Sequence, residues 1–223
     1  MERAGFSPRP GRWTRLAAWL TLVVSAVLLG IALSDVQLAA RLASEDDALE
    51  WLQVILLVAA AAVSARCFLR QRARQQSGAP DLLLTAVFGV LIVGELEVQR
   101  RLVGAPLKLR RLLGHPAAAP LREWALAVAI GAFFIALVAY ALYHRVELWR
   151  WARTALSEAW GRLLLTGVTV FGVTELFERR FNRTWATVLP RNFVEETLEL
   201  LAALYFLLAM LERESPRDDR PSP

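Results

Sequence analysis

The sequence predicts an all-α integral membrane protein, built as a bundle of six transmembrane helices. Two observations lead to this prediction. The chain of 223 residues is 56% hydrophobic, and its mean hydropathy is positive, at +0.40. In addition, Leu16–Ser34 and Ala125–Tyr143 are each 19 residues long and contain no charged residue. Uncharged runs of this length are typical of helices that cross a membrane, so the lipid bilayer is the first expected partner.

The first helix is expected at about residues 14–35. It shares one feature with a signal peptide, because Arg9, Arg12 and Arg15 precede its apolar run. However, the run is longer than the hydrophobic region of a typical signal peptide, and no clear small-x-small cleavage site follows it. We therefore expect an uncleaved membrane helix, preceded by a cytoplasmic tail at residues 1–13.

Five further helices are expected after the first, separated by polar or proline-containing connections. They lie at about residues 47–70, 82–101, 122–144, 160–180 and 194–212. With the first helix they form one transmembrane domain over residues 14–212. Residues 213–223 are charged and rich in proline, which predicts a disordered cytoplasmic tail.

Four of these helices contain few consecutive uncharged residues. Leu82–Gly94 has 13, whereas Leu163–Thr174 and Leu200–Leu211 have 12 each. Such stretches cover roughly 18–20 Å of a hydrocarbon layer about 30 Å thick. The second helix, with Trp51–Ala65, is short as well. To cross the bilayer, each of these helices has to draw part of a charged flank into the apolar layer.

The charged flanks of these four helices contain recurring glutamates and arginines. The second and sixth helices begin with "DDALEWL" (46–52) and "EETLELL" (195–201), and the third and fifth end with "GELEVQRR" (94–101) and "VTELFERR" (173–180). In a six-helix topology all four flanks lie at the outer surface and form one layer. The candidates in this layer for binding a cation or a substrate are Glu50, Glu95, Glu97, Glu175, Glu178, Glu196 and Glu199, and those for ion pairing or anion binding are Arg100, Arg101, Arg179 and Arg180.

The distribution of basic residues sets the expected orientation. With a cytoplasmic N-terminus, 15 of the 26 Lys and Arg residues lie on the cytoplasmic side, which Lys and Arg prefer. All but one of them are Arg, and this excess of Arg together with Ala and Leu is typical of GC-rich bacterial coding. We therefore expect a multi-pass protein of a bacterial inner membrane, with both termini in the cytoplasm.

The layer of acids and arginines permits a purely structural interpretation. Arg binds carboxylate through two parallel hydrogen bonds. Pairs of this kind would tie four helices together at the outer surface. The layer would then serve only helix assembly, in a structural or accessory subunit.

The layer of acids and arginines also permits two functional interpretations. Clustered carboxylates without His or Cys suit hard cations such as Ca²⁺, Mg²⁺ or Mn²⁺, or shared protons. Alternatively, a metal held by Glu50, Glu95 and Glu199 could activate water beside a lipid phosphate, as in an outer-leaflet lipid-modifying enzyme. Of the two functional interpretations, we place binding or transport of a cation or of a proton-coupled solute before the enzyme, because an ionisable residue within a membrane is by default a functional candidate; the structural interpretation stands ahead of both. Only Thr85, Thr166 and Thr169 offer polar steps inward from the layer.

Other residue types narrow the choice of cofactor and partner. A single cysteine, Cys67, excludes an iron–sulfur cluster, and two histidines argue against haem. No soluble segment is long enough to present a basic face to nucleic acid. The segment "APLKLRRLLG" (105–114) interleaves leucines with three cations, which fits either a short interfacial helix on anionic lipid or a loop beside the acidic layer. The sequence specifies neither an oligomeric state nor a catalytic residue.

Overall fold

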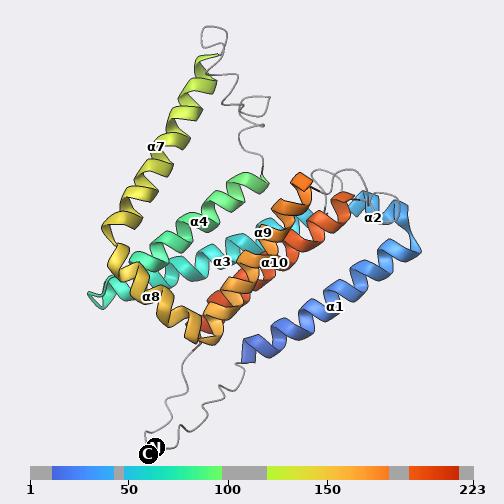
Figure 1. Ribbon diagram of the computed structural model, residues 1–223, viewed down its shortest axis with the longest axis horizontal. Coiled ribbons are helices and arrows are strands. Elements are labelled where there is room, and N and C mark those ends of the chain that lie inside the picture. Colours follow the sequence, from blue (N-terminus) through green and yellow to red (C-terminus); the bar gives the residue numbers. More distant parts are fainter. Residues whose placement is uncertain (1–11, 43–47, 97–119, 181–190, 216–223) are drawn as a thin grey trace, which may run out of the picture.

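The computed structural model of the chain describes residues 12–42, 48–96, 120–180 and 191–215 (Figure 1). These residues form eight α-helices and no strand, which confirms the all-α prediction. The helices, labelled as in Figure 1, are α1 (Arg12–Ser34), α2 (Val36–Leu42), α3 (Ala48–Ala73), α4 (Ala79–Glu95), α7 (Leu121–Tyr143), α8 (Arg145–Ser157), α9 (Ala159–Arg180) and α10 (Arg191–Glu214).

Six of these helices match the six that the sequence predicts. They are α1, α3, α4, α7, α9 and α10, and most of their described ends agree with the expected ends to within a few residues. Helix α4 ends at Glu95, whereas the expected third helix continued to residue 101, beyond the described range. At the C-terminus, α10 continues through Glu214, so the first residues of the expected tail are helical. The side chain of Arg213 holds this last turn against α4 by pairing with Asp81.

The two remaining helices, α2 and α8, lie in segments expected to be connections. Helix α8 forms because its apolar residues follow helical spacing. Leu148, Trp151 and Ala155 recur at intervals of three and four and are turned toward the rest of the chain, whereas Trp149 and Arg150 are exposed.

Three of the described helices are long and apolar enough to cross a membrane. They are Trp13–Ser34, Ala48–Ala73 and Leu121–Tyr143. The chain therefore has the candidate spans of a multi-pass membrane protein. The large apolar side chains exposed along them, such as Leu22 and Ile135, are suited to contact with lipid.

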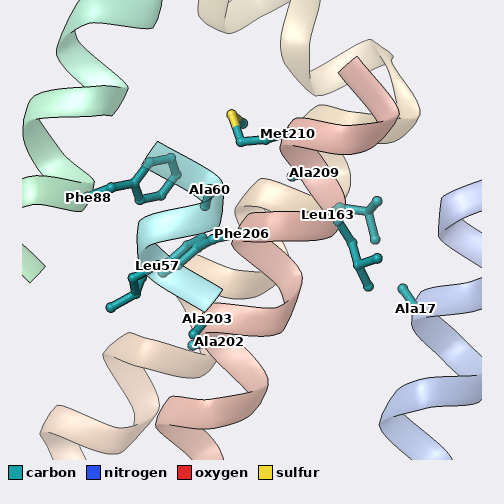
Figure 2. Close-up of a cluster of buried hydrophobic side chains, with 11 residues drawn as sticks. Ala17, Leu57, Ala60, Phe88, Leu163, Ala202, Ala203, Phe206, Ala209 and Met210 are labelled. Carbon is teal, nitrogen blue, oxygen red and sulfur yellow. The ribbon is translucent and has the colours of Figure 1, made fainter. Parts of the chain in front are cut away.

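Helix α10 occupies the centre of the bundle and packs against α1, α3 and α9. The main buried cluster gathers around its apolar side chains (Figure 2). Phe206 of α10 contacts Phe88 of α4 with 5.6 Å between ring centroids, and Met210 is completely buried. This core joins α10 to α1, α3, α4 and α9, and it leaves α7 out.

Helix α7 stands apart from the bundle (Figure 1). None of its most apolar stretch is buried within the chain. An apolar groove of about 190 Å³ separates it from α4 and is lined by side chains such as Leu83, Phe133 and Tyr140.

The helix directions divide polar residues between two ends of the bundle. The Asp81 end contains the start of α4 and the end of α10, and the start of α1 lies there too, since the backbone N–H of Trp13 donates to Glu212 Oε2 at 3.0 Å. The opposite end, which we call the glutamate end, contains the starts of α3 and α10 and the end of α4. The predicted acids fall at this second end.

Candidate functional site

Four predicted acids converge at the glutamate end. They are Glu50 on α3, Glu95 at the end of α4, and Glu196 and Glu199 on α10. Glu95 is close enough to Glu196 and Glu50 for electrostatic repulsion, and Glu199 is repelled by Glu95 and Glu196. We call these four residues the glutamate cluster.

The cluster forms because helical spacing repeats on two of its three helices. Glu196 and Glu199 are three residues apart on α10, so both lie on one face. Glu50 and Gln53 have the same separation on α3, and α3 packs directly against α10. The packing of α4 on α3 then brings Glu95 to the same place.

Gln53 is the polar residue of this site that the sequence analysis missed. Its side chain is only 1% exposed. The amide Nε2 donates to Glu196 Oε2 and to the Glu196 backbone carbonyl, each at 3.0 Å. The amide oxygen Oε1 is buried and accepts no hydrogen bond from the described residues. A signal was present in the sequence, because Gln53 interrupts an apolar run one turn after Glu50.

An unsatisfied buried acceptor costs about 1–3 kcal/mol, and a water, a protonated carboxyl group or another donor beside Gln53 Oε1 would remove that cost. Neighbouring carboxylates disfavour one another's charge, and burial adds to the effect. A proton held on one carboxyl group would relieve the repulsion and could supply the missing donor. The cluster is therefore suited to holding a proton.

The predicted metal site is not formed in the part of the chain that the structure describes. No group of three or more His, Cys, Asp or Glu side chains there is arranged to hold a metal ion. Glu50, Glu95 and Glu199 share one end of the bundle without forming a ligand set.

The other predicted residues are only partly described. Glu175 lies on α9, half-buried, directly after the buried Thr174. The side chains of Glu178, Arg179 and Arg180 in the last turn of α9 lie outside the description, as do Glu97, Arg100, Arg101 and the segment 105–114 in full. The predicted ion pairs between these arginines and the acids therefore involve residues outside the described part of the chain, and they stay a prediction.

The three threonines expected as polar steps inward do not form an internal path. The hydroxyls of Thr166 and Thr169 on α9 donate to carbonyls of their own helix, and both residues are exposed. The hydroxyl of Thr85 donates in the same way to the Asp81 carbonyl.

A second buried polar group lies at the Asp81 end. Asp81 is completely buried and forms a two-point ion pair with Arg213, in which Nη1 donates to Oδ1 and Nη2 donates to Oδ2, the latter at 2.9 Å. The guanidinium of Arg213 also lies 4.8 Å from the ring centroid of Trp160 and 5.6 Å from that of Trp151. Ser64 of α3 donates to the Asp81 carbonyl at 2.9 Å.

This pair ties five helices together: α4 and α10 through its own two residues, α3 through Ser64, and α8 and α9 through Trp151 and Trp160. The guanidinium of Arg213 compensates the charge of the buried Asp81 carboxylate. The sequence analysis missed the pair because Arg213 was expected in the tail and Asp81 in a connection.

The comparisons with known proteins return no relative. No protein-family model matches the chain, and no curated protein and no solved structure matches it. The function therefore has to be argued from the residues and their geometry.

Proposed function

We propose that this chain is a six-span inner-membrane protein whose glutamate cluster binds a proton, or a cation in its place, during cation- or proton-coupled binding or transport. The observation that carries the proposal is the buried amide of Gln53. Its nitrogen is bound to Glu196 while its oxygen lacks a donor, within a group of acids that repel one another. A site that exchanges a proton or a cation with solvent accounts for both features.

Six crossings are supported by packing. The three candidate spans include α1 and α3, and α10 lies against both of them. Helix α9 packs along α10, and α4 packs along α3. With 22 and 24 residues, α9 and α10 are about 33 and 36 Å long, enough to cross a hydrocarbon layer of about 30 Å. These helices would share the bilayer with the spans they contact.

The two ends of the described chain support an even number of crossings. The start of α1 and the end of α10 meet through the hydrogen bond from Trp13 to Glu212. An even number of spans places both on one side of the membrane. The bias of Lys and Arg favours the cytoplasm for that side, so the glutamate cluster would face the outer side.

A charge within the membrane is costly, about 2.5–3.5 kcal/mol for Asp, Lys or Arg at a helix centre on insertion scales. Four ionised carboxylates drawn together would add mutual repulsion to that cost. A bound proton or cation lowers both contributions, which gives the cluster a reason to bind one.

Infrared difference spectroscopy on the purified protein in liposomes tests the proton version. Between about pH 5 and about pH 9, we expect the carbonyl stretch of protonated carboxyl groups to decrease in the wild type. Glu199→Gln should reduce that change. Asp35→Asn is the matched control, because Asp35 is exposed and only accepts a hydrogen bond from the Leu38 N–H, a role that Asn fills as well.

The cation version has a separate readout. Thermal unfolding of the protein with and without Na⁺, Mg²⁺ or Ca²⁺ should show a higher melting temperature with the bound ion, and Glu199→Gln should remove the shift. If the infrared change and the melting temperature are both the same in E199Q as in the wild type, the cluster has no binding role. It then serves helix assembly alone.

A further inference from the structure

Helix α8 connects the candidate span α7 to α9 and lies across the ends of other helices (Figure 1). Only His144 separates it from α7, and it packs against α4, α7 and α9. Its 13 residues are about 20 Å long, which is too short to cross a hydrocarbon layer of about 30 Å. Helix α8 therefore follows a candidate span without being one itself.

One flank of α8 is apolar and turned away from the rest of the chain. Val146, Trp149 and Leu156 are each more than half exposed. Their separations of three and seven residues place them on one side of the helix. Three large apolar side chains gathered on so short a helix are unfavourable in water. We call these three residues the apolar flank.

The opposite flank of α8 is polar. Arg150, Thr154 and Ser157 are exposed there. Arg150 and Thr154 also border a polar pocket that lies between α8, the α3–α4 turn and the end of α10. Residues 74–77 of that turn are all exposed and all polar. The two flanks of one helix are therefore suited to different surroundings, one apolar and one aqueous.

The side chain of Arg153 indicates the depth at which the apolar flank lies. Its guanidinium lies 4.8 Å from the ring centroid of Trp149. Indole rings favour the boundary between lipid headgroups and acyl chains, and arginine can keep its stem in lipid while its charge stays in water. A position deep in the acyl layer would cost the guanidinium its hydration. The pair of side chains thus fits the headgroup boundary.

We propose that α8 is an interfacial helix, whose apolar flank lies in the lipid at the Asp81 end while its polar flank faces water. An amphipathic helix binds a membrane surface in this way. Lipid fits the apolar flank better than a partner protein does, because the flank continues the exposed surface of α7. Leu142 of α7 is exposed four residues before Val146, and none of the most apolar stretch of α7 is buried within the chain. The inference rests on the membrane position of α7, which is part of the proposed function, and it does not involve the glutamate cluster.

Spin labels on single cysteines test the proposal in the full-length protein in liposomes. In a Cys67→Ala background, labels at Val146→Cys and Leu156→Cys should be more accessible to oxygen than to a water-soluble nickel chelate. Labels at Thr154→Cys and Ser157→Cys should show the reverse. Leu156 and Ser157 form the matched pair, because they are neighbours that differ in flank. Equal access of the nickel chelate to all four labels overturns the proposal. Low access of both reagents to the first two labels also overturns it, since a protein would then cover the apolar flank.

A label on α7 separates this inference from the proposed function. Ile135 is exposed within the candidate span, so a label at Ile135→Cys should lie in lipid. If it does, and both flanks of α8 contact water, only the interfacial helix is contradicted. If the nickel chelate reaches Ile135→Cys as well, α7 does not cross the membrane, and the six-span proposal fails together with this one.

Tryptophan fluorescence gives a second readout without labels. Lipids brominated near the headgroup end of their acyl chains should quench Trp149, so Trp149→Phe should reduce the quenching of the whole protein. Trp151→Phe is the matched control, because its indole Nε1 is buried within the chain. A loss of quenching in W151F that equals or exceeds the loss in W149F would contradict the proposed placement of the apolar flank.

Discussion

At the scale of single residues, two buried polar side chains distinguish the ends of the bundle. Gln53 lies beside four acids with its oxygen unsatisfied, whereas Asp81 lies beside one arginine with both oxygens bound. In our proposal, a further proton or ion completes the first arrangement. The second is complete within the chain. This contrast is why we assign binding to the glutamate end and cohesion to the Asp81–Arg213 pair.

The Asp81–Arg213 pair makes a prediction about stability. Arg213→Met should leave a buried carboxylate without its partner and destabilise the protein by about 3–5 kcal/mol. The double variant Asp81→Leu with Arg213→Met should recover most of that loss, because no unpaired charge remains. Thermal unfolding of the single and double variants in the same detergent measures both effects. An unchanged melting temperature in R213M would show that the pair contributes nothing to stability.

Gln53 makes a second prediction. Gln53→Leu keeps the approximate size of the side chain but removes its hydrogen bonds to Glu196. Loss of a hydrogen bond to a charged group costs about 1.5–3 kcal/mol, so the melting temperature should fall. If Q53L is instead more stable than the wild type, the amide oxygen is an uncompensated acceptor and no proton or cation binds there.

The residue scale also shows what could be predicted from sequence. The acids of the cluster were identified because 12 to 15 uncharged residues are too few to cross a bilayer. Gln53 and Asp81 were not identified, since the burial of one polar residue depends on contacts with the distant helix α10. The spacing of residues in a sequence reveals groups of charged side chains on one helix face, but it does not reveal that a single amide is buried.

At the scale of elements, the long helices were predictable and the short ones were not. Apolar runs bounded by charges gave the positions of α1, α3, α4, α7, α9 and α10. Helices α2 and α8 combine apolar and charged residues within a few turns, so their segments resembled polar connections. Helix α8 nevertheless lines a polar pocket of about 280 Å³ at the Asp81 end, with Arg150 and Trp151 among the lining residues.

The turn between α8 and α9 depends on one glycine. A Cβ at Gly161 would lie 1.9 Å from the Ala155 carbonyl oxygen, whereas a Cβ at Gly172 on the same helix would meet nothing within 4 Å. Gly161→Ala should therefore lower the melting temperature, because the backbone has to move. Gly172→Ala should leave it unchanged or raise it slightly, since Ala favours a helix over Gly by about 0.5–1 kcal/mol. Equal effects of the two variants would contradict the described packing of α8 on α9.

At the scale of the whole molecule, the topology that we propose puts the two polar ends on opposite sides of the membrane. The candidate spans Trp13–Ser34 and Ala48–Ala73 run in opposite directions and separate the Asp81 end from the glutamate end. Our topology places the Asp81 end in the cytoplasm. The glutamate cluster then faces the outer side.

Cysteine labelling in intact cells tests this arrangement. Cys67 is the only native cysteine, so a Cys67→Ala background allows single cysteines to be placed at exposed positions. A membrane-impermeant maleimide should label Ser34→Cys at the glutamate end in intact cells, because that end faces outward. It should label Ser77→Cys at the Asp81 end only after the cells are permeabilised. The reverse labelling pattern would show that the orientation is inverted, with the spans unchanged. Labelling of both positions in intact cells would contradict a bundle that crosses the membrane between these two ends.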